Sequence, residues 1–262
     1  MKNHNILEIK NLSLHFGGLK AVDQLSFHVP EGEIVALIGP NGAGKTTVFN
    51  CVTRFYDHYT GDIIYYKEDQ SPLNLRQIKV NKVVSEGIVR TFQNIELIPD
   101  LSILDNVLVG AHKYIKTSIF EHIIRTPRMI RHEKELRQKA IDILTFLNMA
   151  HLKDIFAIGL PYGLLKKIEL ARALITEPRL LILDEPAAGL NEQETEELAH
   201  IIQKLKKEKN MTILLIEHDM SFVMNMSDHV CAISFGKFLA YDIPEKIKKH
   251  PLVQEAYLGK DE

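Results

Sequence analysis

The sequence predicts an α/β protein whose parallel sheet carries a phosphate-binding loop. Gly39–Thr46 reads Gly-Pro-Asn-Gly-Ala-Gly-Lys-Thr and fits the pattern G-x-x-x-x-G-K-[ST]. The apolar run 34–38 precedes this loop and a helix-like segment follows it, which is the context that the motif requires. Two further apolar runs, 180–183 and 211–216, flank a helical segment. The order strand, helix, strand with unbroken apolar strands indicates a parallel β-α-β unit.

Composition and charge are those of an ordinary globular protein. Of the 262 residues, 45% are apolar and 25% are charged, and the net charge of -2 argues against a broad nucleic-acid or anionic-membrane surface. Cys51 and Cys231 provide no disulfide framework, which favours a reducing compartment. No apolar run approaches the roughly 18 residues of a membrane span, and no signal-peptide pattern is present. We therefore expect any work at a membrane to go through a partner.

The N-terminal segment predicts a small antiparallel sheet. Residues 6–10 and 12–16 alternate apolar and polar side chains and predict two strands, and a Gly17-Gly18 turn follows. Residues 25–29 alternate again and lead into the apolar strand before the phosphate-binding loop. The segment from Thr46 to Val52 after the loop is expected to be helical.

Two short strands and a loop are expected next. Residues 61–66 and 88–93 predict the strands, with Gln93 at the end of the second. The polar stretch 67–76, which contains Pro72, predicts the loop.

From residue 100 to about 170 the pattern changes to helix. Ser102 or Asp105 is placed to cap one helix, and Thr126-Pro127 to begin another with proline at its first position. A stripe at helical spacing predicts the face that packs on the core: Leu136, Ala140, Ile143, Leu144 and Leu147.

The C-terminal third predicts a capped helix and a hairpin. Glu192–Lys209 should be helical, with Asn191 as its N-cap and acidic residues in its first turns. Residues 230–235 and 237–241 alternate around Gly236 and predict a closing hairpin, followed by a short amphipathic tail.

The phosphate-binding loop provides the first candidate site. Its backbone N–H groups and the following helix N-terminus favour phosphate, Lys45 is expected to reach the β- and γ-phosphates, and Thr46 to bind Mg²⁺. A glycine-rich turn before a buried helix is the alternative. The expected nucleotide-binding residues of the loop are Asn41, Gly42, Gly44, Lys45, Thr46 and Thr47.

Polar residues at the ends of three strands provide the second candidate site. Asp184 follows a buried strand, where a carboxylate binds Mg²⁺ directly or through water, and Glu185 can polarise the water that attacks the γ-phosphate. His218 can reach the γ-phosphate, and the amide oxygen of Gln93 can bind Mg²⁺ and orient water. Taken alone, each is equally an ordinary surface residue at a strand end.

Together these motifs resemble those of the nucleotide-binding subunits of ATP-binding cassette (ABC) transporters over essentially the whole chain. The loop resembles Walker A, Leu180–Glu185 resembles Walker B, and Gln93 and His218 match the Q-loop and the switch histidine. Ala188–Asn191 matches the D-loop, with Asn191 in place of the more usual Asp. The resemblance implies that Glu185 is catalytic together with His218 and Gln93, that ATP and Mg²⁺ are bound, and that Phe16 stacks on adenine.

The resemblance also implies a fold and an assembly. The fold is a P-loop NTPase (RecA-like) core with an antiparallel β subdomain and an inserted α-helical subdomain. Residues 1–262 then form one domain, with 1–98 and 176–262 as the core and 99–175 as the helical and signature subdomain. Two such subunits, as a homo- or heterodimer, close head to tail on two ATP molecules and move two permease subunits, which hold them at the cytoplasmic face of the membrane.

The signature segment departs from the family pattern Leu-Ser-Gly-Gly-Gln. Residues 160–164 read Leu-Pro-Tyr-Gly-Leu before an expected helix, Leu165–Ile175. The resemblance implies that Tyr162 and Gly163 bind the γ-phosphate of ATP held by the opposite subunit. Leu164 replaces a glutamine, so the segment is either a tolerated variant or a weakened site.

A narrower resemblance concerns the cargo. Several segments are similar to those of branched-chain amino-acid importer ATP-binding subunits, which work with a periplasmic solute-binding protein. An ATPase of a related lipid or lipopolysaccharide exporter, or a low-turnover regulatory ATP switch, remains an alternative. The segments are Pro161–Gly163, 168–172, Gly87–Gln93, Arg125–Pro127, Asp184–Asn191, Ile216–Met220 and Ala256–Gly259.

Overall fold

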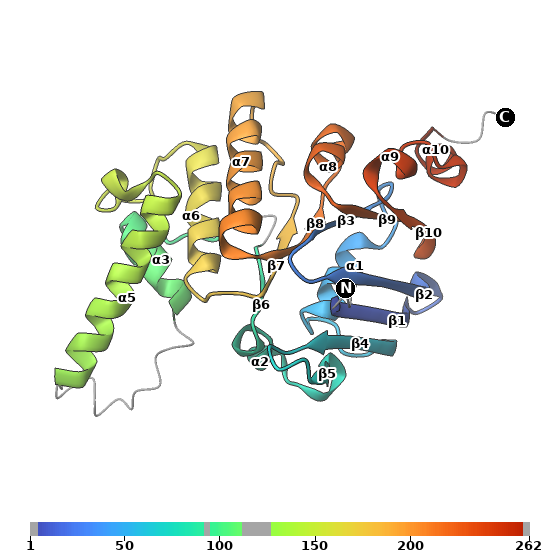
Figure 1. Ribbon diagram of the computed structural model, residues 1–262, viewed down its shortest axis with the longest axis horizontal. Coiled ribbons are helices and arrows are strands. Elements are labelled where there is room, and N and C mark those ends of the chain that lie inside the picture. Colours follow the sequence, from blue (N-terminus) through green and yellow to red (C-terminus); the bar gives the residue numbers. More distant parts are fainter. Residues whose placement is uncertain (1–4, 92–94, 112–126, 259–262) are drawn as a thin grey trace.

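Two β-sheets with helices packed around them form the fold in the computed structural model (Figure 1). The structure describes residues 5–91, 95–111 and 127–258. In this part of the chain, no helix is both long and apolar enough to cross a membrane.

The larger sheet has six strands in the order β10-β9-β3-β8-β7-β6. All neighbours are parallel except β10, which pairs antiparallel with β9. The adjacent parallel strands β7 and β8 confirm the predicted β-α-β unit, and β9 and β10 confirm the predicted hairpin. The strands are β3 (Ile34–Ile38), β6 (Ile88–Arg90), β7 (Leu180–Asp184), β8 (Thr212–Ile216), β9 (His229–Ser234) and β10 (Lys237–Asp242).

The smaller sheet has four strands in the order β2-β1-β4-β5: β1 (Asn5–Phe16), β2 (Leu19–Pro30), β4 (Thr60–Tyr66) and β5 (Pro72–Asn74). The prediction of two strands before Gly17 was wrong, because β1 is continuous. Its pairing with β2 shifts between Ile9 and Leu12, and Asn11 there has a left-handed φ of 50°, so the break in the sequence pattern is a bulge.

The stretch 67–76 is also not entirely a loop, because β5 lies inside it and pairs with β4. β5 is the last strand of its sheet. A proline that lacks an N–H is tolerated on such an edge, so Pro72 does not exclude a strand.

Side chains on the two faces of the six-stranded sheet enter two different hydrophobic clusters. Val35 and Leu37 of β3 join the cluster formed with the smaller sheet and α1 (Lys45–Val52). Ile34 and Ala36 join the other cluster, which contains α6 and α7 residues. This alternation follows from the two-residue period of a strand. The sheet is therefore covered on both faces, as its unbroken apolar strands predict.

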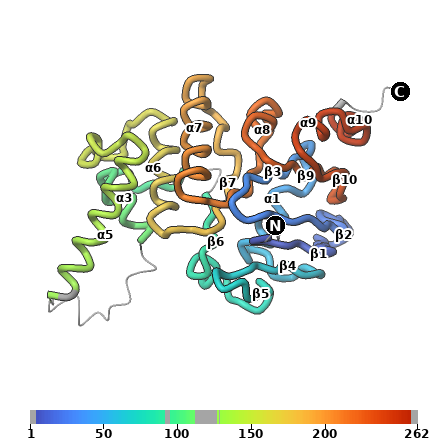
Figure 2. The backbone as a smooth tube through the Cα atoms, in the orientation of Figure 1, coloured from blue at the N-terminus to red at the C-terminus, as the bar shows by residue number. Residues whose placement is uncertain are grey.

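Three helices in contact with one another, α3, α5 and α6, gather at one end of the molecule, away from the smaller sheet (Figures 1 and 2). Ser102 caps α3, because its hydroxyl accepts the Asp105 N–H at 3.0 Å. Pro127 begins α5, while Thr126 lies outside the described residues. The stripe on α5 faces the core as predicted. These helices are α3 (Ile103–Val109), α5 (Pro127–Phe146) and α6 (Tyr162–Leu174).

Helix α6 begins three residues earlier than predicted, at Tyr162 instead of Leu165. The carbonyl of Pro161 accepts the N–H groups of Leu164 and Leu165 at 3.0 and 3.1 Å. Pro161 is the N-cap of α6, with an extended ψ of 146° and no side-chain cap.

Of the remaining helices, α7, α8 and α9 each follow a strand of the larger sheet, whereas α2 follows β5 of the smaller sheet. Asn191 caps α7 as predicted, in a reciprocal capping box with Glu194. Their bounds are α2 (Val80–Val83), α7 (Glu192–Lys209), α8 (Met220–Met226), α9 (Pro244–Ile247) and α10 (Pro251–Leu258), with short 3-10 turns at Leu75–Gln77, Val84–Glu86 and Ala150–Leu152.

Candidate active site

The phosphate-binding loop connects β3 to α1, and neighbouring strands pack against it. Gly42 and Gly44 have left-handed φ values of 77° and 100°, which other residues adopt only with strain. A Cβ at Gly44 would lie 2.4 Å from the Ala21 carbonyl oxygen, and one at Gly39 would lie 2.2 Å from that of Ile233. Gly39 and Gly44 are therefore required by close backbone packing against β9 and β2.

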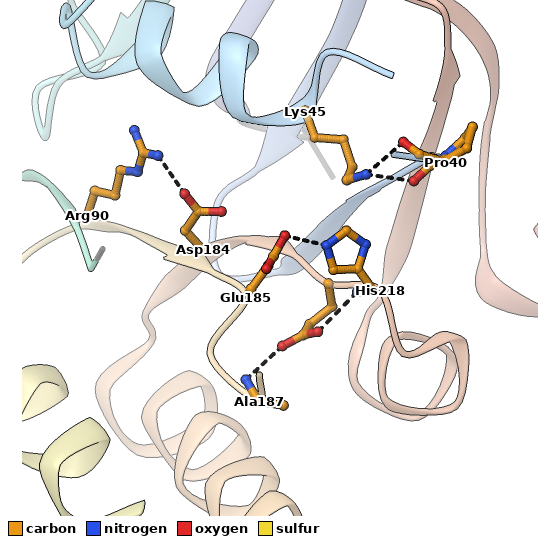
Figure 3. A network of polar contacts seen from close by, with 9 residues as sticks. Pro40, Lys45, Arg90, Asp184, Glu185, Ala187 and His218 are labelled. Atoms are coloured by element: carbon orange, nitrogen blue, oxygen red, sulfur yellow. Dashed lines mark hydrogen bonds and ion pairs between the residues drawn. The ribbon is translucent and has the colours of Figure 1, made fainter. Parts of the chain in front are cut away.

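Lys45, the first residue of α1, is buried. Its Nζ donates hydrogen bonds to the carbonyl oxygens of Gly39 at 2.6 Å and Pro40 at 3.0 Å (Figure 3). Burial lowers the pKa of Lys45, and the negative charges of Glu185 and Asp184 oppose this shift. A buried cation beside backbone N–H groups at a helix start suits a phosphate ligand.

Asp184 ends β7, and its carboxylate is ion-paired with Arg90, which ends the neighbouring strand β6. Arg90 Nη2 and Asp184 Oδ2 are 2.5 Å apart, and only 8% and 5% of the two side chains is exposed. Arg90 Nη1 also donates to Asn50 Oδ1 of α1 at 2.6 Å. The sequence motifs assign no role to Arg90, which lies inside the predicted strand 88–93 and ends the observed strand β6.

Glu185 and His218 meet at the same edge of the sheet, where β7 and β8 end. His218 Nε2 and a carboxylate oxygen of Glu185 are hydrogen-bonded (Figure 3). Glu185 has a left-handed φ of 49°, and its N–H donates to the Ile216 carbonyl at 2.9 Å. The predicted residues Lys45, Glu185 and His218 are thus brought together by strands that are far apart in the sequence.

Glu217 is a second buried carboxylate at this edge, to which the sequence motifs assign no role. It accepts the Ala187 N–H at 2.7 Å and the His218 N–H at 3.0 Å. Burial raises the pKa of Glu217, and the two backbone N–H groups oppose that shift. Glu217 therefore ties the segment after β7 to the segment after β8. Its position directly after a buried apolar strand was the available sequence signal.

A cavity of about 390 Å³ lies beside the phosphate-binding loop. A second cavity of about 510 Å³ touches Pro40, Asn41 and Ala43 of the loop and is otherwise lined by α10 and the β9–β10 segment, without Glu185 or His218. The first therefore contains the chemistry. It is lined by Asn41–Thr47, Glu185, His218, Phe16, Leu19, Lys20, Ala21 and Phe235.

Two aromatic side chains of this cavity are partly open to solvent. Phe16, predicted to stack on adenine, is 40% exposed, and its ring stands edge-on to Tyr56 and His58 with centroid distances of 5.2 and 5.8 Å. Phe235, between β9 and β10, is 84% exposed and has a left-handed φ of 47°. The sequence gives no signal for Phe235, because only the pairing of β9 with β3 brings it to the loop.

The signature residues do not line this cavity. Tyr162 packs against Gly189, where a Cβ would lie 3.1 Å from the Tyr162 ring, and Gly163 packs against Glu194 of α7. Leu164 is half-buried against the core. The signature segment and the D-loop segment are therefore in direct contact.

The predicted Mg²⁺ ligands are only partly described. Thr46 lines the cavity and Asp184 lies at its edge of the sheet, whereas Gln93 is outside the described residues. Hydroxyl and carboxylate oxygens are donors that Mg²⁺ prefers, and Mg²⁺ commonly takes few protein ligands besides phosphates and water. No group of three His, Cys, Asp or Glu in the described part of the chain could hold a metal by itself. The donor set thus fits Mg²⁺ bound together with a nucleotide.

One protein-family model matches a stretch of the chain that contains most of the site residues. A family model described as ABC transporter matches residues 22–188. The segment contains the phosphate-binding loop, Asp184 and Glu185.

Curated relatives match nearly the whole chain. The high-affinity branched-chain amino acid transport ATP-binding protein BraF of Pseudomonas aeruginosa is 43% identical over 254 residues, which cover 97% of this chain and 98% of that protein. The protein LivG of Escherichia coli, described in the same words, is 41% identical with the same coverage.

Solved structures share the fold. A nucleotide-free ATP-binding cassette from an ABC transporter has a TM-score of 0.82 and 32% identity, covering 98% of this chain and 100% of that chain. An ATP-binding cassette in its ADP conformation has a TM-score of 0.83 and 31% identity, covering 98% and 99%.

Proposed function

Because the chain belongs to the ABC transporter family, we propose that it is the ATP-hydrolysing subunit of an importer for branched-chain or related amino acids. One observation carries the ATPase assignment: the phosphate-binding loop, Glu185 and His218 line a single cavity. The names of the relatives, branched-chain amino acid transport ATP-binding proteins, support the choice of cargo.

Nucleotide binding follows from the loop and the half-exposed aromatic ring. The loop N–H groups and Lys45 bind the phosphates and offset the charge that develops during phosphoryl transfer. To do so, Lys45 exchanges its contacts with the Gly39 and Pro40 carbonyls for phosphate oxygens. Phe16, held edge-on by two neighbouring rings, offers a stacking surface to adenine.

Hydrolysis depends on the residues at the ends of β7 and β8. Glu185 polarises the attacking water as general base, and its hydrogen bond to His218 orients the carboxylate. His218 is 44% exposed in its side chain and is therefore accessible to a γ-phosphate. Thr46, Asp184 and Gln93 would hold Mg²⁺, which would neutralise phosphate charge.

The signature segment points to a two-subunit site. Tyr162 is 42% exposed at the start of α6 and lies outside its own chain's cavity, so a second subunit would bring the helix start to a phosphate. In this proposal two such ATPase subunits close on two ATP molecules. The closure moves two permease subunits at the cytoplasmic face of the membrane, which receive cargo from a periplasmic solute-binding protein.

The assignment of the base is tested by Glu185→Gln, which keeps the shape of the side chain but removes its basicity. We expect steady-state ATP hydrolysis to fall by roughly 100-fold or more, while the affinity for ATP is retained. Phosphate release and binding of a fluorescent ATP analogue measure the two quantities. Wild-type turnover in this variant would show that Glu185 is not the base.

The cargo is tested by reconstituting the chain with the permeases and the solute-binding protein encoded by neighbouring genes. Leucine, isoleucine or valine uptake into proteoliposomes should require ATP and should stop with Glu185→Gln. Uptake of another solute, or ATP-dependent export of a lipid from the same vesicles, would assign the ATPase to one of the related systems instead.

A further inference from the structure

Arg90 joins three elements beneath the site. It ends β6, its Nη2 contacts Asp184 Oδ2 at the end of β7, and its Nη1 donates to Asn50 Oδ1 of α1. The guanidinium carbon also lies 5.6 Å from the centre of the Phe49 ring. Since α1 begins with Lys45 and Thr46, this one side chain connects the carboxylate to the helix that carries the loop.

The contact fixes which oxygen of Asp184 is available for other partners. Arg90 occupies Oδ2, and Figure 3 shows the other carboxylate oxygen turned away from Arg90, on the side of Glu185 and Lys45. The charge of Asp184 also acts on Lys45, whose pKa it helps to raise against the effect of burial. The carboxylate therefore lies between a structural cation and the phosphate-binding cation.

A guanidinium is suited to this task because its donors are held in one plane. It can serve two acceptors at fixed angles, whereas a lysine ammonium is a flexible point charge that cannot reproduce both contacts. With both side chains more than nine-tenths buried, water competes little for these hydrogen bonds.

We propose that Arg90 is a positioning residue that orients Asp184 toward the Mg²⁺ of the bound nucleotide and ties it to α1 through Asn50. This inference rests on the proposed function, because it concerns the metal that accompanies ATP. Partners of this kind, which orient metal ligands, contribute to metal affinity without touching the metal.

The test separates metal binding from nucleotide binding in the purified full-length chain. The Kd of a fluorescent, non-hydrolysable ATP analogue is measured in EDTA and again with Mg²⁺, and the ratio gives the contribution of the metal. For Arg90→Lys we expect the Kd in EDTA to stay within about twofold of wild type and the ratio to fall roughly 10-fold. The electron paramagnetic resonance spectrum of Mn²⁺, bound in place of Mg²⁺, should change as well.

Arg179→Lys is the matched control. Arg179 forms the same kind of ion pair, with Glu31, just before the opposite end of β7, and its substitution should leave the ratio unchanged. Asn50→Ala removes only the second acceptor and should lower the ratio about threefold. Asn50→Ala serves as the test of the proposal if thermal unfolding shows that Arg90→Lys does not fold.

The positioning role is overturned if the ratio of Kd values stays unchanged in Arg90→Lys and Asn50→Ala. If only one of these variants folds, its ratio alone decides. An equal fall in Arg179→Lys overturns it too, because the effect would then be a general response to a lost ion pair. Absence of nucleotide binding by the wild-type chain would instead contradict the proposed function.

Discussion

At the scale of single residues, the site depends on backbone conformations that only a few residue types tolerate. Gly42 and Gly44 both have left-handed φ values, but their surroundings differ. A Cβ on Gly44 meets the Ala21 carbonyl oxygen at 2.4 Å, whereas no atom of the residues that the structure describes lies within 4 Å of a Cβ on Gly42. A side chain at Gly42 would therefore meet conformational strain alone, whereas one at Gly44 would meet strain and a steric clash.

Gly44→Ala and Gly42→Ala test this difference. The left-handed conformation costs each variant about 1–2 kcal/mol, but only Gly44→Ala must also displace the backbone of β2. We expect ATP to raise the unfolding temperature of wild type and, more weakly, of Gly42→Ala, and to leave that of Gly44→Ala unchanged. Thermal scans with and without ATP measure the change in unfolding temperature of each variant. An equal response of both variants would show that the contact with Ala21 is unimportant.

The positions of side chains that directly follow an apolar strand were predictable, and positions that depend on strand pairing were not. Glu185 and His218 each follow an apolar run in the sequence, and parallel strands end at the same edge of a sheet. Arg90 and Phe235 contribute to the site because β6 pairs with β7 and β9 pairs with β3. A single sequence does not contain the order of strands in the sheet, so these contacts could not be inferred from it.

At the scale of elements, α6 and α7 bring the signature segment and the D-loop segment into one unit. Gly163 packs against Glu194, and the carboxylate of Glu194 accepts the Asn191 N–H at 3.0 Å. Tyr162 packs against Gly189 of the same segment. A displacement of the start of α6 must therefore move the start of α7.

Leu164→Gln tests whether the unusual signature weakens the site. The side chain lies in the first turn of α6, where an amide could donate to a phosphate of the partner's nucleotide. We expect ATPase activity of the assembled transporter to rise or stay unchanged. Because Leu164 is half-buried, a loss of about 1 kcal/mol should lower the unfolding temperature by roughly 2–4 °C.

One result would contradict the prediction for Leu164→Gln. A large loss of ATPase activity with a normal unfolding temperature would show that a leucine at this position is positively required. Leu165→Gln, one residue further along the same helix and also partly buried against the core, is the control for a general effect of polarity.

Element types were predicted more reliably than element ends. The helix at Glu192–Lys209 was correct at both ends. Its N-cap is encoded by Asn191 and Glu194, and Asn210 adopts a left-handed conformation just after its last residue. The start of α6 differs from the prediction because Pro161 forms no side-chain cap, and the bulge at Asn11 interrupts the alternating pattern of one continuous strand. Ends fixed by side-chain chemistry are visible in a sequence, whereas ends fixed by tertiary pairing are not.

At the scale of the whole molecule, one hydrophobic cluster joins the N-terminal sheet to the centre of the larger sheet. Cys51 of α1 and Cys231 of β9 both belong to it and are fully buried. Burial raises the pKa of Cys51 to about 12 and also raises that of Cys231. Both thiols are thus protonated and inaccessible in the folded protein.

Thiol reactivity should therefore report global unfolding. At pH 8, well below the raised pKa of about 12, nearly all of the Cys51 thiol is protonated and therefore unreactive. Burial raises the pKa of Cys231 as well, so the same holds for its thiol. We expect Ellman's reagent to detect no thiol in the native protein and two in guanidinium chloride. Rapid reaction of one thiol without denaturant would show that the cluster opens locally.

The phosphate-binding loop near the start of the chain is completed by segments near its end. Strand β3 lies between β8 and β9, and the Gly236 N–H donates to the Ala43 carbonyl at 2.9 Å. During synthesis the loop leaves the ribosome early, whereas β8, β9 and Gly236, which pack against β3 and the loop, leave it late. A growing chain therefore has no finished nucleotide site until the segment around Gly236 has left the ribosome.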